Sequence, residues 1–259
     1  MTALGKTGIL IQARMGSSRF PEKVMQEILG ETMIARVLER LEGAGSAAIL
    51  AVVTSDDASD NGLCRYLKDA NRLFFRGSLH DVLSRYYHAA VHFELDTIVR
   101  VTADCPLIDP ALIENLLAEH QKNQAAASFS PEGLPDGFRF NILSFAALQK
   151  CFSDARLASE REHVVPYIWN HPSEFRVYRP SDFSGAPKCH LSVDYPEDLE
   201  LMRAIYEELY TWEGPPFTMQ SVFDLLKERP EMLSLNAGVN RVDGYRKSLD
   251  EDLKAGKDA

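Results

Sequence analysis

The chain has 259 residues, of which 45% are hydrophobic and 25% charged, the mix of a soluble globular protein. Asp and Glu (38) outnumber Lys and Arg (28), which gives a formal net charge of −10. DNA or RNA is a poor partner for such a surface, because binding a phosphate backbone needs a net basic face. A small anion held by a few local cations remains possible.

Short apolar runs alternate with amphipathic segments along the first half of the chain. The apolar runs predict strands at 8–13, 47–53, 73–75 and 96–102. Segments with apolar residues three and four positions apart predict helices at 32–41, 60–70, 81–93 and 110–122. This repetition is typical of an α/β fold with a mostly parallel sheet and helices on both faces. Ligands bind such sheets beyond the carboxyl ends of the strands, so the residues directly after each strand are the candidates for function.

The pattern changes in the second half. Residues 130–137 are rich in Pro and Gly and predict a loop. Beyond it we expect strands at 138–143 and 191–193, and helices at 159–171 and 196–210. We predict a single domain over residues 1–240 with an insertion at about 130–190, followed by a charged C-terminal tail at 241–259.

The cysteines and the N-terminus indicate the compartment. The four cysteines are far apart and include no Cys-x-x-Cys pair, which argues against a zinc site and fits reduced thiols. The apolar run at 9–11 is too short for a signal peptide or a membrane span. We therefore expect a cytoplasmic protein with no membrane association.

A cationic loop follows the first predicted strand. Its glycine and serines can offer amides and hydroxyls to phosphate oxygens, and its three cations suit phosphate binding; these residues are Arg14, Gly16, Ser17, Ser18, Arg19 and Lys23. The glycine spacing matches neither the Walker loop nor the dinucleotide fingerprint. The alternative is a solvated basic loop, but its position after the first strand favours a phosphate site.

Two carboxylates end predicted strands. Asp104 follows the strand at 96–102, and Asp194 follows the short strand at 191–193. Because Mg²⁺ is commonly held by one or two carboxylates together with substrate phosphates, the pair is a candidate metal site if the fold brings it together. The alternative for either residue is a helix or turn cap, and we assign Asp109 to that role.

Several motifs together resemble the cytidylyltransferases of the spore coat polysaccharide biosynthesis protein F type, relatives of the enzymes that make CMP-3-deoxy-manno-octulosonate and CMP-sialic acid. The resemblance extends over about residues 8–210. It rests on the stretches 12–23, 76–78, 81–87, 101–110, 135–137, 159–164 and 193–199.

The resemblance implies a Rossmann-like nucleotidyltransferase fold, CTP as donor, a sugar or sugar-acid acceptor, Mg²⁺ as cofactor and a homodimer formed through the insertion. It implies that Asp104 and Asp194 bind the metal and that Arg14, Arg19 and Lys23 serve catalysis at the triphosphate. The implied nucleotide-binding set is Gln12, Ala13, Arg14, Gly16, Ser17, Ser18, Arg19, Lys23, Thr54, Ser55, Arg76, Arg100 and Asp104. The implied acceptor-binding set is Asp136, Arg139, Asn141, Glu160, His163 and His190.

Three positions depart from the family pattern. Arg139 and Asn141 stand where relatives usually have Asp and Glu, and His190 stands where they usually have Arg. The expected metal and phosphate positions are intact, so the departures concern the acceptor or turnover. One reading is a more anionic acceptor that pairs with Arg139, and the other is a nucleotide-binding homologue that has lost activity.

A second enzyme class is also compatible with a strand-end Asp. Nucleotide-sugar glycosyltransferases share this kind of sheet, but they usually show an Asp-x-Asp motif, whereas Pro106 stands two residues after Asp104. They also have no need of a pyrophosphate-binding Arg/Lys loop. The sequence therefore favours the nucleotidyltransferase.

Overall fold

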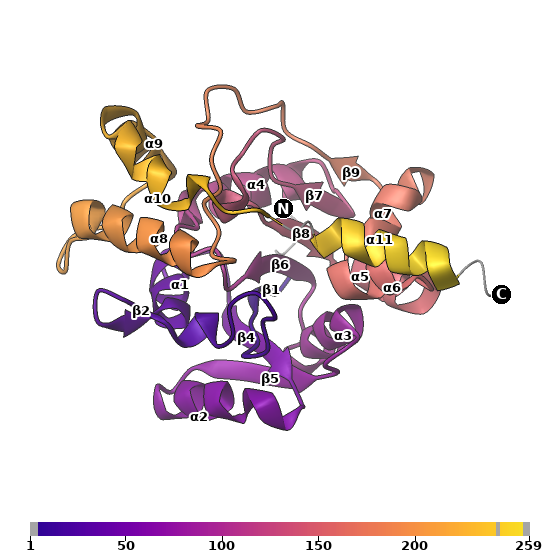
Figure 1. Ribbon diagram of the computed structural model, residues 1–259. Coiled ribbons are helices and arrows are strands. Elements are labelled where there is room, and N and C mark those ends of the chain that lie inside the picture. Colours follow the sequence, from indigo (N-terminus) through magenta and orange to yellow (C-terminus); the bar gives the residue numbers. More distant parts are fainter. Residues whose placement is uncertain (1–4, 242–243, 256–259) are drawn as a thin grey trace.

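A seven-stranded sheet forms the centre of the molecule (Figure 1). The computed structural model describes residues 5–241 and 244–255. The strands are β1 (Thr7–Gln12), β4 (Ile49–Ser55), β5 (Leu73–Gly77), β6 (Thr97–Thr102), β7 (Ala127–Phe129), β8 (Asn141–Ser144) and β9 (Val177–Tyr178), in the order β5-β4-β1-β6-β8-β7-β9. Only β8 runs against its neighbours, so the predicted mostly parallel sheet is confirmed among the described residues. A separate hairpin pairs β2 (Glu27–Ile28) with β3 (Glu31–Thr32).

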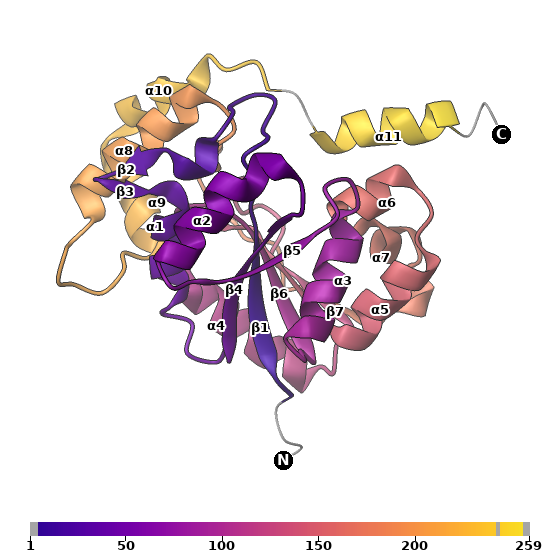
Figure 2. The ribbon, with the colours of Figure 1, turned by 90° about the horizontal axis from the view of Figure 1, so that it is seen from below.

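Helices cover both faces of the sheet (Figure 2). One face packs on α1 (Met33–Leu41), α2 (Asn61–Asp69), α4 (Pro110–Lys122), α8 (Pro196–Leu209) and α9 (Met219–Glu228). The other face packs on α3 (Val82–His92), α5 (Phe145–Asp154) and α7 (Pro166–Asn170). Successive residues of β1 alternate between these cores: Ile9 and Ile11 face the first, and Leu10 faces the second. The central strand is therefore buried on both sides, as in parallel sheets generally.

Two predicted elements of the second half are wrong. The described residues 191–193 run as a loop, because the backbone of Val193 bonds to Asp104 and Lys23 and does not enter a strand ladder. The helix expected at 159–171 is divided into α6 (Ala158–His163) and α7, since Val164 has a φ of 72° and Pro166 cannot continue the hydrogen-bond pattern. In the segment expected to be a strand at 138–143, β8 begins only at Asn141, after a 3₁₀ turn at Asp136–Phe138.

The C-terminal part of the chain crosses the carboxyl edge of the sheet. It leaves α10 (Ser234–Ala237) on the α8 side and ends in α11 (Gly244–Ala255), which packs against α6 on the opposite side (Figures 1 and 2). Most of the expected tail is thus a helix, and residues 242–243 and 256–259 lie outside the described part. No helix in that part is long and apolar enough to span a membrane.

Candidate functional site

Lys23 connects the two strand-end carboxylates. Its Nζ lies 3.1 Å from Asp104 Oδ2 and 3.1 Å from Asp194 Oδ1, and it donates to the carbonyl of Val193 at 2.5 Å. Asp104 follows β6, and Asp194 is 90 residues further along the chain, just before α8. The fold therefore brings together the pair that the sequence proposed as a metal site.

The cationic loop after β1 folds around Met15. The Met15 carbonyl accepts the backbone N–H groups of Ser17 and Glu22, both at 2.9 Å. The Met15 N–H donates to Asp60 Oδ1 at 2.7 Å, and Asp60 is fully buried. The same carboxylate accepts bonds from Thr54 Oγ1 and Ser55 N, both at 3.0 Å, and from the Ser55 hydroxyl. A buried carboxylate thus ties the loop to the end of β4.

Neighbouring positive charges and hydrogen-bond donors keep both acids ionised. Burial alone would raise the pKa of Asp104, but Lys23 and the Thr102 hydroxyl outweigh it and lower that pKa. Burial likewise opposes ionisation of Asp194, whose pKa falls well below its ordinary value because of His190, Lys23 and Arg19. Arg19 Nη2 lies 2.5 Å from Asp194 Oδ1. The pKa of Lys23 is raised by the two carboxylates despite its burial, so it remains an ammonium.

His190 extends this network toward the predicted acceptor residues. Its Nδ1 lies 3.3 Å from Asp136 Oδ2, and its Nε2 lies 3.6 Å from Asp194 Oδ2. Burial lowers the pKa of His190, but Asp136 and Asp194 outweigh it and raise it to about 9. Arg139 pairs with the other oxygen of Asp136 at 3.2 Å. His190 therefore adds positive charge between Asp136 and Asp194.

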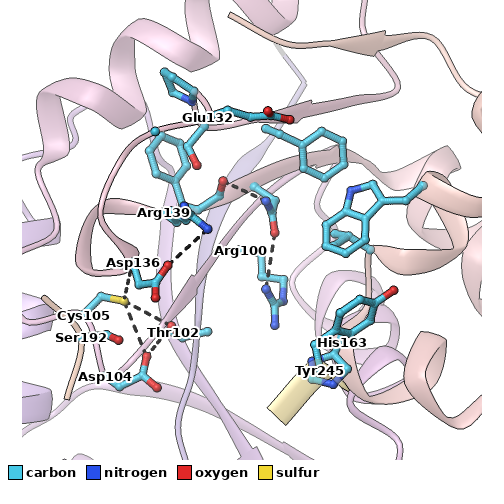
Figure 3. A pocket seen from close by; sticks show the side chains of 18 of the residues that line it. Arg100, Thr102, Asp104, Cys105, Glu132, Asp136, Arg139, His163, Ser192 and Tyr245 are labelled. Atoms are coloured by element: carbon cyan, nitrogen blue, oxygen red, sulfur yellow. Dashed lines mark hydrogen bonds and ion pairs between the residues drawn. The ribbon is translucent and has the colours of Figure 1, made fainter. Parts of the chain in front are cut away.

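A cavity of about 690 Å³ opens beside these groups (Figure 3). Its size lies within the range of about 300–1,000 Å³ for small-molecule sites. The predicted residues that line it are Arg100, Asp104, Asp136, Arg139, Asn141, His163, His190 and Asp194. Five of the six predicted acceptor residues thus lie around one cavity, which also reaches both predicted metal ligands.

Arg100 lies between the carboxylates and the far end of the cavity (Figure 3). Its Nη2 donates to Gln12 Oε1 at 3.1 Å, and its Nη1 lies 3.4 Å from Asn141 Oδ1. Its Nε is buried without a hydrogen-bond partner among the described residues. A buried donor without a protein partner is costly, so this N–H is available to an ordered water molecule or to a polar group of a ligand.

The other twelve predicted residues do not line the cavity: eight belong to the stretch 12–23, which includes the cationic loop, and four lie elsewhere. Thr54 and Ser55 are fully buried against Asp60, and Arg76 donates to the carbonyls of Ser55 and Asp57. Glu160 is 3% exposed and accepts from Arg156 N, Leu157 N and Asn170. These contacts give the four residues structural roles, and their contact with substrate stays a prediction.

Comparisons with known proteins show which family the chain belongs to. A family model described as cytidylyltransferase matches residues 8–221. The chain belongs to the cytidylyltransferase family. A cytidylyltransferase structure from Leptospira borgpetersenii is 29% identical, covers 91% of this chain and 99% of its own, and superimposes with a TM-score of 0.83. The spore coat polysaccharide biosynthesis protein SpsF of Bacillus subtilis is 29% identical over 86% of this chain and 94% of its own.

A more distant structure shares the fold. The CMP:2-keto-3-deoxy-manno-octonic acid synthetase solved with CTP is 18% identical, covers 78% of this chain and 99% of its own, and has a TM-score of 0.62. The predicted nucleotidyltransferase fold and the predicted family are both confirmed. The roles of individual residues in this cytidylyltransferase stay predictions.

The carboxylate pair of the cytidylyltransferase fits a hard divalent cation. Asp104 Oδ2 and Asp194 Oδ1 are close enough to share one cation; in this structure that cation is the Lys23 ammonium, which would have to move for a metal ion to take the same position. The described residues contain no cluster of three or more acidic, His or Cys side chains suited to a metal. Mg²⁺ often relies on one or two carboxylates and takes its other ligands from substrate phosphates and water, so the donor set matches that ion.

Sequence reasoning missed two groups of residues in this cytidylyltransferase. Asp60 reads in the sequence as an ordinary helix-start acid, because its bond to Met15 joins residues 45 positions apart. The aromatic wall of the cavity is formed by Phe129, Trp169 and Tyr245, which come from three separate elements. Neither group has a local spacing that could have signalled it.

Proposed function

We propose that this cytidylyltransferase transfers CMP from CTP to a hydroxyl of a sugar or sugar acid and releases pyrophosphate, in the assembly of a surface polysaccharide or glycoconjugate. The acceptor oxygen forms a bond to the α-phosphorus, and the bond from that phosphorus to the β-phosphate oxygen breaks. The observation that carries the proposal is the junction of a cationic loop, two convergent carboxylates and one polar cavity.

The triphosphate lies against the loop after β1 in this proposal. Arg14, Gly16 and Ser18 are exposed there, and Ser17 and Arg19 are half-buried. Their side chains and amides neutralise the pyrophosphate as it leaves, which lowers the barrier by stabilising developing charge. Lys23 and Arg19 act from the carboxylate side, where burial strengthens each charge–charge contact.

Asp104 and Asp194 hold Mg²⁺ in the active complex. An ion held there would supply positive charge at the α-phosphate and would make the attacking hydroxyl more acidic. The protein's own contribution is to keep both acids ionised and oriented: the Thr102 hydroxyl donates to Asp104 at 2.5 Å, and Lys23, Arg19 and His190 surround Asp194.

The acceptor occupies the cavity. Arg139 and Arg100 present cations to it, and Asn141 presents a neutral amide where relatives usually carry an acid. Four acids among the described residues also line the cavity, namely Asp104, Glu132, Asp136 and Asp194. The preference for an anionic acceptor therefore rests on Arg100 and Arg139 in particular, whose guanidinium groups attract an opposite charge in a partly desolvated pocket. We also propose a homodimer formed through the insertion at about 130–190, as the family resemblance implies.

A turnover screen tests the proposal. CTP, UTP, GTP and ATP are each combined with sugar acids and phosphorylated sugars in the presence of Mg²⁺, and pyrophosphate is measured. We expect release only with CTP and an anionic sugar. Transfer from a nucleotide sugar without pyrophosphate would identify a glycosyltransferase. CTP binding without turnover of any pair would identify a nucleotide-binding protein that is not an enzyme.

A further inference from the structure

The end of the cavity that lies away from the metal carboxylates is aromatic. Figure 3 shows His163 and Tyr245 across the cavity from Asp104, with Arg100 between them. Trp169 and Phe129 line the same cavity. Trp169 is 41% exposed although it stands in a concave site. Large aromatic surface left open in a pocket indicates a ligand that covers it.

The rings form one connected group. Trp169 and Tyr245 meet edge to face with ring centroids 5.8 Å apart, and Tyr245 and His163 do so at 5.2 Å. Phe129 lies 6.0 Å from Trp169, and the Arg179 guanidinium stacks on Phe129 at 4.5 Å. Such edge-to-face packing fixes each ring, so the group offers a rigid surface at low entropic cost.

Tyr245 reaches this group from α11, which lies beyond the residues matched by the family model. Polar contacts fix that helix on α6. The Ser248 hydroxyl lies 3.1 Å from His163 Nε2 and donates to Glu162 Oε2 at 3.0 Å, and Asp252 Oδ1 accepts from Ser159 N at 3.2 Å. The apolar side chains Leu249 and Leu253 are 37% and 65% exposed. Because its described leucines are exposed, the polar contacts with α6 account for the position of α11, which brings Tyr245 to the cavity wall.

The chemistry of the surface specifies what it binds. The face of an aromatic ring is electron-rich, so it attracts C–H groups that carry partial positive charge. A sugar presents such C–H groups on one side of its ring or along its carbon tail. Nearby Arg100 and Arg179 supply donors for the hydroxyl or anionic groups of the same molecule.

We propose that α11 is part of the acceptor site, and that Tyr245 and Trp169 form an aromatic subsite for a C–H face of the acceptor beyond the reacting hydroxyl. The proposal rests on the proposed function, in which the cavity receives the acceptor. It assigns Tyr245 as a specificity-determining residue. It also implies an acceptor that extends from the carboxylates to this wall, such as a sugar acid with a carbon tail or a second ring.

Tryptophan fluorescence of the full-length protein tests the subsite without turnover. The chain has two tryptophans, Trp169 in the cavity and Trp212, which is 74% exposed and lines no part of that cavity. The probes are the eight-carbon 2-keto-3-deoxy-manno-octonate and the six-carbon glucuronate. We expect the Trp212→Phe variant to respond to the eight-carbon acid more strongly than to glucuronate, and the Trp169→Phe variant to give no response.

Matched variants of α11 distinguish the contribution of the Tyr245 ring to binding from that of the helix as a whole. In the Trp212→Phe background, Tyr245→Ala should weaken binding of the eight-carbon probe by roughly threefold to tenfold, the worth of one aromatic contact. Tyr245→Phe should bind as before, and so should Leu253→Ala, which changes an exposed position of the same helix. Calorimetry with CTP should give one dissociation constant for all of them, which shows that the variants are folded.

Two results would overturn the subsite. One is a Tyr245→Ala protein that binds CTP and the eight-carbon probe as tightly as its parent. The other is the absence of any Trp169 response to both probes. Failure of the proposed function looks different: the probe still changes Trp169 fluorescence, but no combination of nucleotide and sugar releases pyrophosphate.

Discussion

At the scale of single residues, Lys23 compensates the charges of both carboxylates at the site. A buried ammonium between two partly buried carboxylates compensates charges that burial would otherwise make costly. Arg19 and His190 add positive charge on the outer side of Asp194. The site is therefore prepared for an anionic substrate before CTP arrives, although the whole chain carries a net charge of −10.

The first prediction concerns Arg19. If its guanidinium contacts the β- and γ-phosphates, Arg19→Ala should weaken CTP binding roughly tenfold to a hundredfold, the usual cost of losing a charge-assisted contact. CMP binding should change much less. Calorimetry with both nucleotides measures the difference, and Arg72→Ala, which removes an ion pair with Glu42, serves as control. Equal weakening of CTP and CMP would place Arg19 away from the outer phosphates.

The second prediction concerns the metal ligands. Asp104→Asn and Asp194→Asn should each raise the Mg²⁺ concentration needed for half-maximal pyrophosphate release and lower the maximal rate, because an amide is a weaker ligand for a hard cation than a carboxylate. The control is Asp69→Asn, an exposed acid at the end of α2. An unchanged Mg²⁺ requirement in both variants would remove the two acids from the metal site.

The third prediction concerns Asp60, whose carboxylate fixes Met15. Replacement by Asn turns one acceptor oxygen into a donor that faces the N–H of Ser55, an unsatisfied buried pair worth about 1–3 kcal/mol. We expect Asp60→Asn to lower the free energy of unfolding by that amount and also to weaken CTP binding, because the loop loses its anchor. Denaturant titration and calorimetry measure the two effects. The control is Asp57→Asn at an exposed cap of the same turn. Reduced stability with unchanged CTP affinity would limit Asp60 to a structural role.

At the scale of elements, local patterns located most of the first half of the chain. Helix α4 matches its predicted bounds, since Pro110 opens it and Asp109 caps it by accepting from Ala111 N at 2.9 Å. Strands and helices up to residue 122 differ from the prediction by a few residues at their ends. These segments are strongly periodic and are bounded by turn residues, so local sequence is enough to find them.

The second half was less predictable because long-range contacts decide it. Asp194 belongs to the site through contacts with Lys23, 171 residues away, and not through a strand. The aromatic wall depends on α11, whose sequence reads as a charged tail. The residues of the candidate site could therefore be predicted from motifs near strand ends. The shape of its acceptor end could not be predicted from the sequence.

The segment around Arg139 gives a prediction at this scale. It lies directly before β8 and lines the cavity, with Arg139 held by Asp136 and by the Leu134 carbonyl. The double change Arg139→Asp with Asn141→Glu removes one positive charge and adds two negative ones. We expect the KM for an anionic acceptor to rise at least roughly tenfold with little change in the KM for CTP. Unchanged acceptor preference together with altered dimerisation or stability would make the segment structural.

Helix α4 gives a prediction of pH dependence. His120 is 4% exposed and pairs with the Ser128 hydroxyl of β7 at 2.8 Å. Burial lowers the pKa of His120 below its ordinary value of 6.5. Below about pH 6.5 the unfolded chain therefore binds a proton that the folded chain does not, so the folded state loses stability as pH falls toward the native pKa of His120. Above pH 6.5 the contribution is complete.

Denaturant titrations between pH 5 and pH 8 measure this effect. We expect His120→Gln to reduce the slope of stability against pH on the acid side by up to about 1.4 kcal/mol per pH unit. The exposed His80 provides the control through His80→Gln. An unchanged acid slope in His120→Gln would show that other groups account for the loss.

At the scale of the whole molecule, the sheet joins every part of the site. Both hydrophobic cores pack on the same strands, and the loop after β1, Asp104 after β6 and the C-terminal helix all meet at one edge. A ligand at that edge contacts segments from both faces of the sheet. Unfolding of the helices on either face should therefore release the ligand, and ligand binding should stabilise both layers together.

Thermal unfolding with and without CTP and Mg²⁺ checks this last expectation. At about 100 times its dissociation constant a ligand adds about 2.7 kcal/mol to the stability of the state that binds it. For a chain of this size each kcal/mol raises Tm by about 2–4 °C, so a single transition should move upward by about 5–10 °C. CMP at the same concentration should have a smaller effect, and Arg19→Ala should reduce the difference between the two nucleotides. Two transitions, of which CTP moves only one, would contradict the single domain and show that the faces unfold independently.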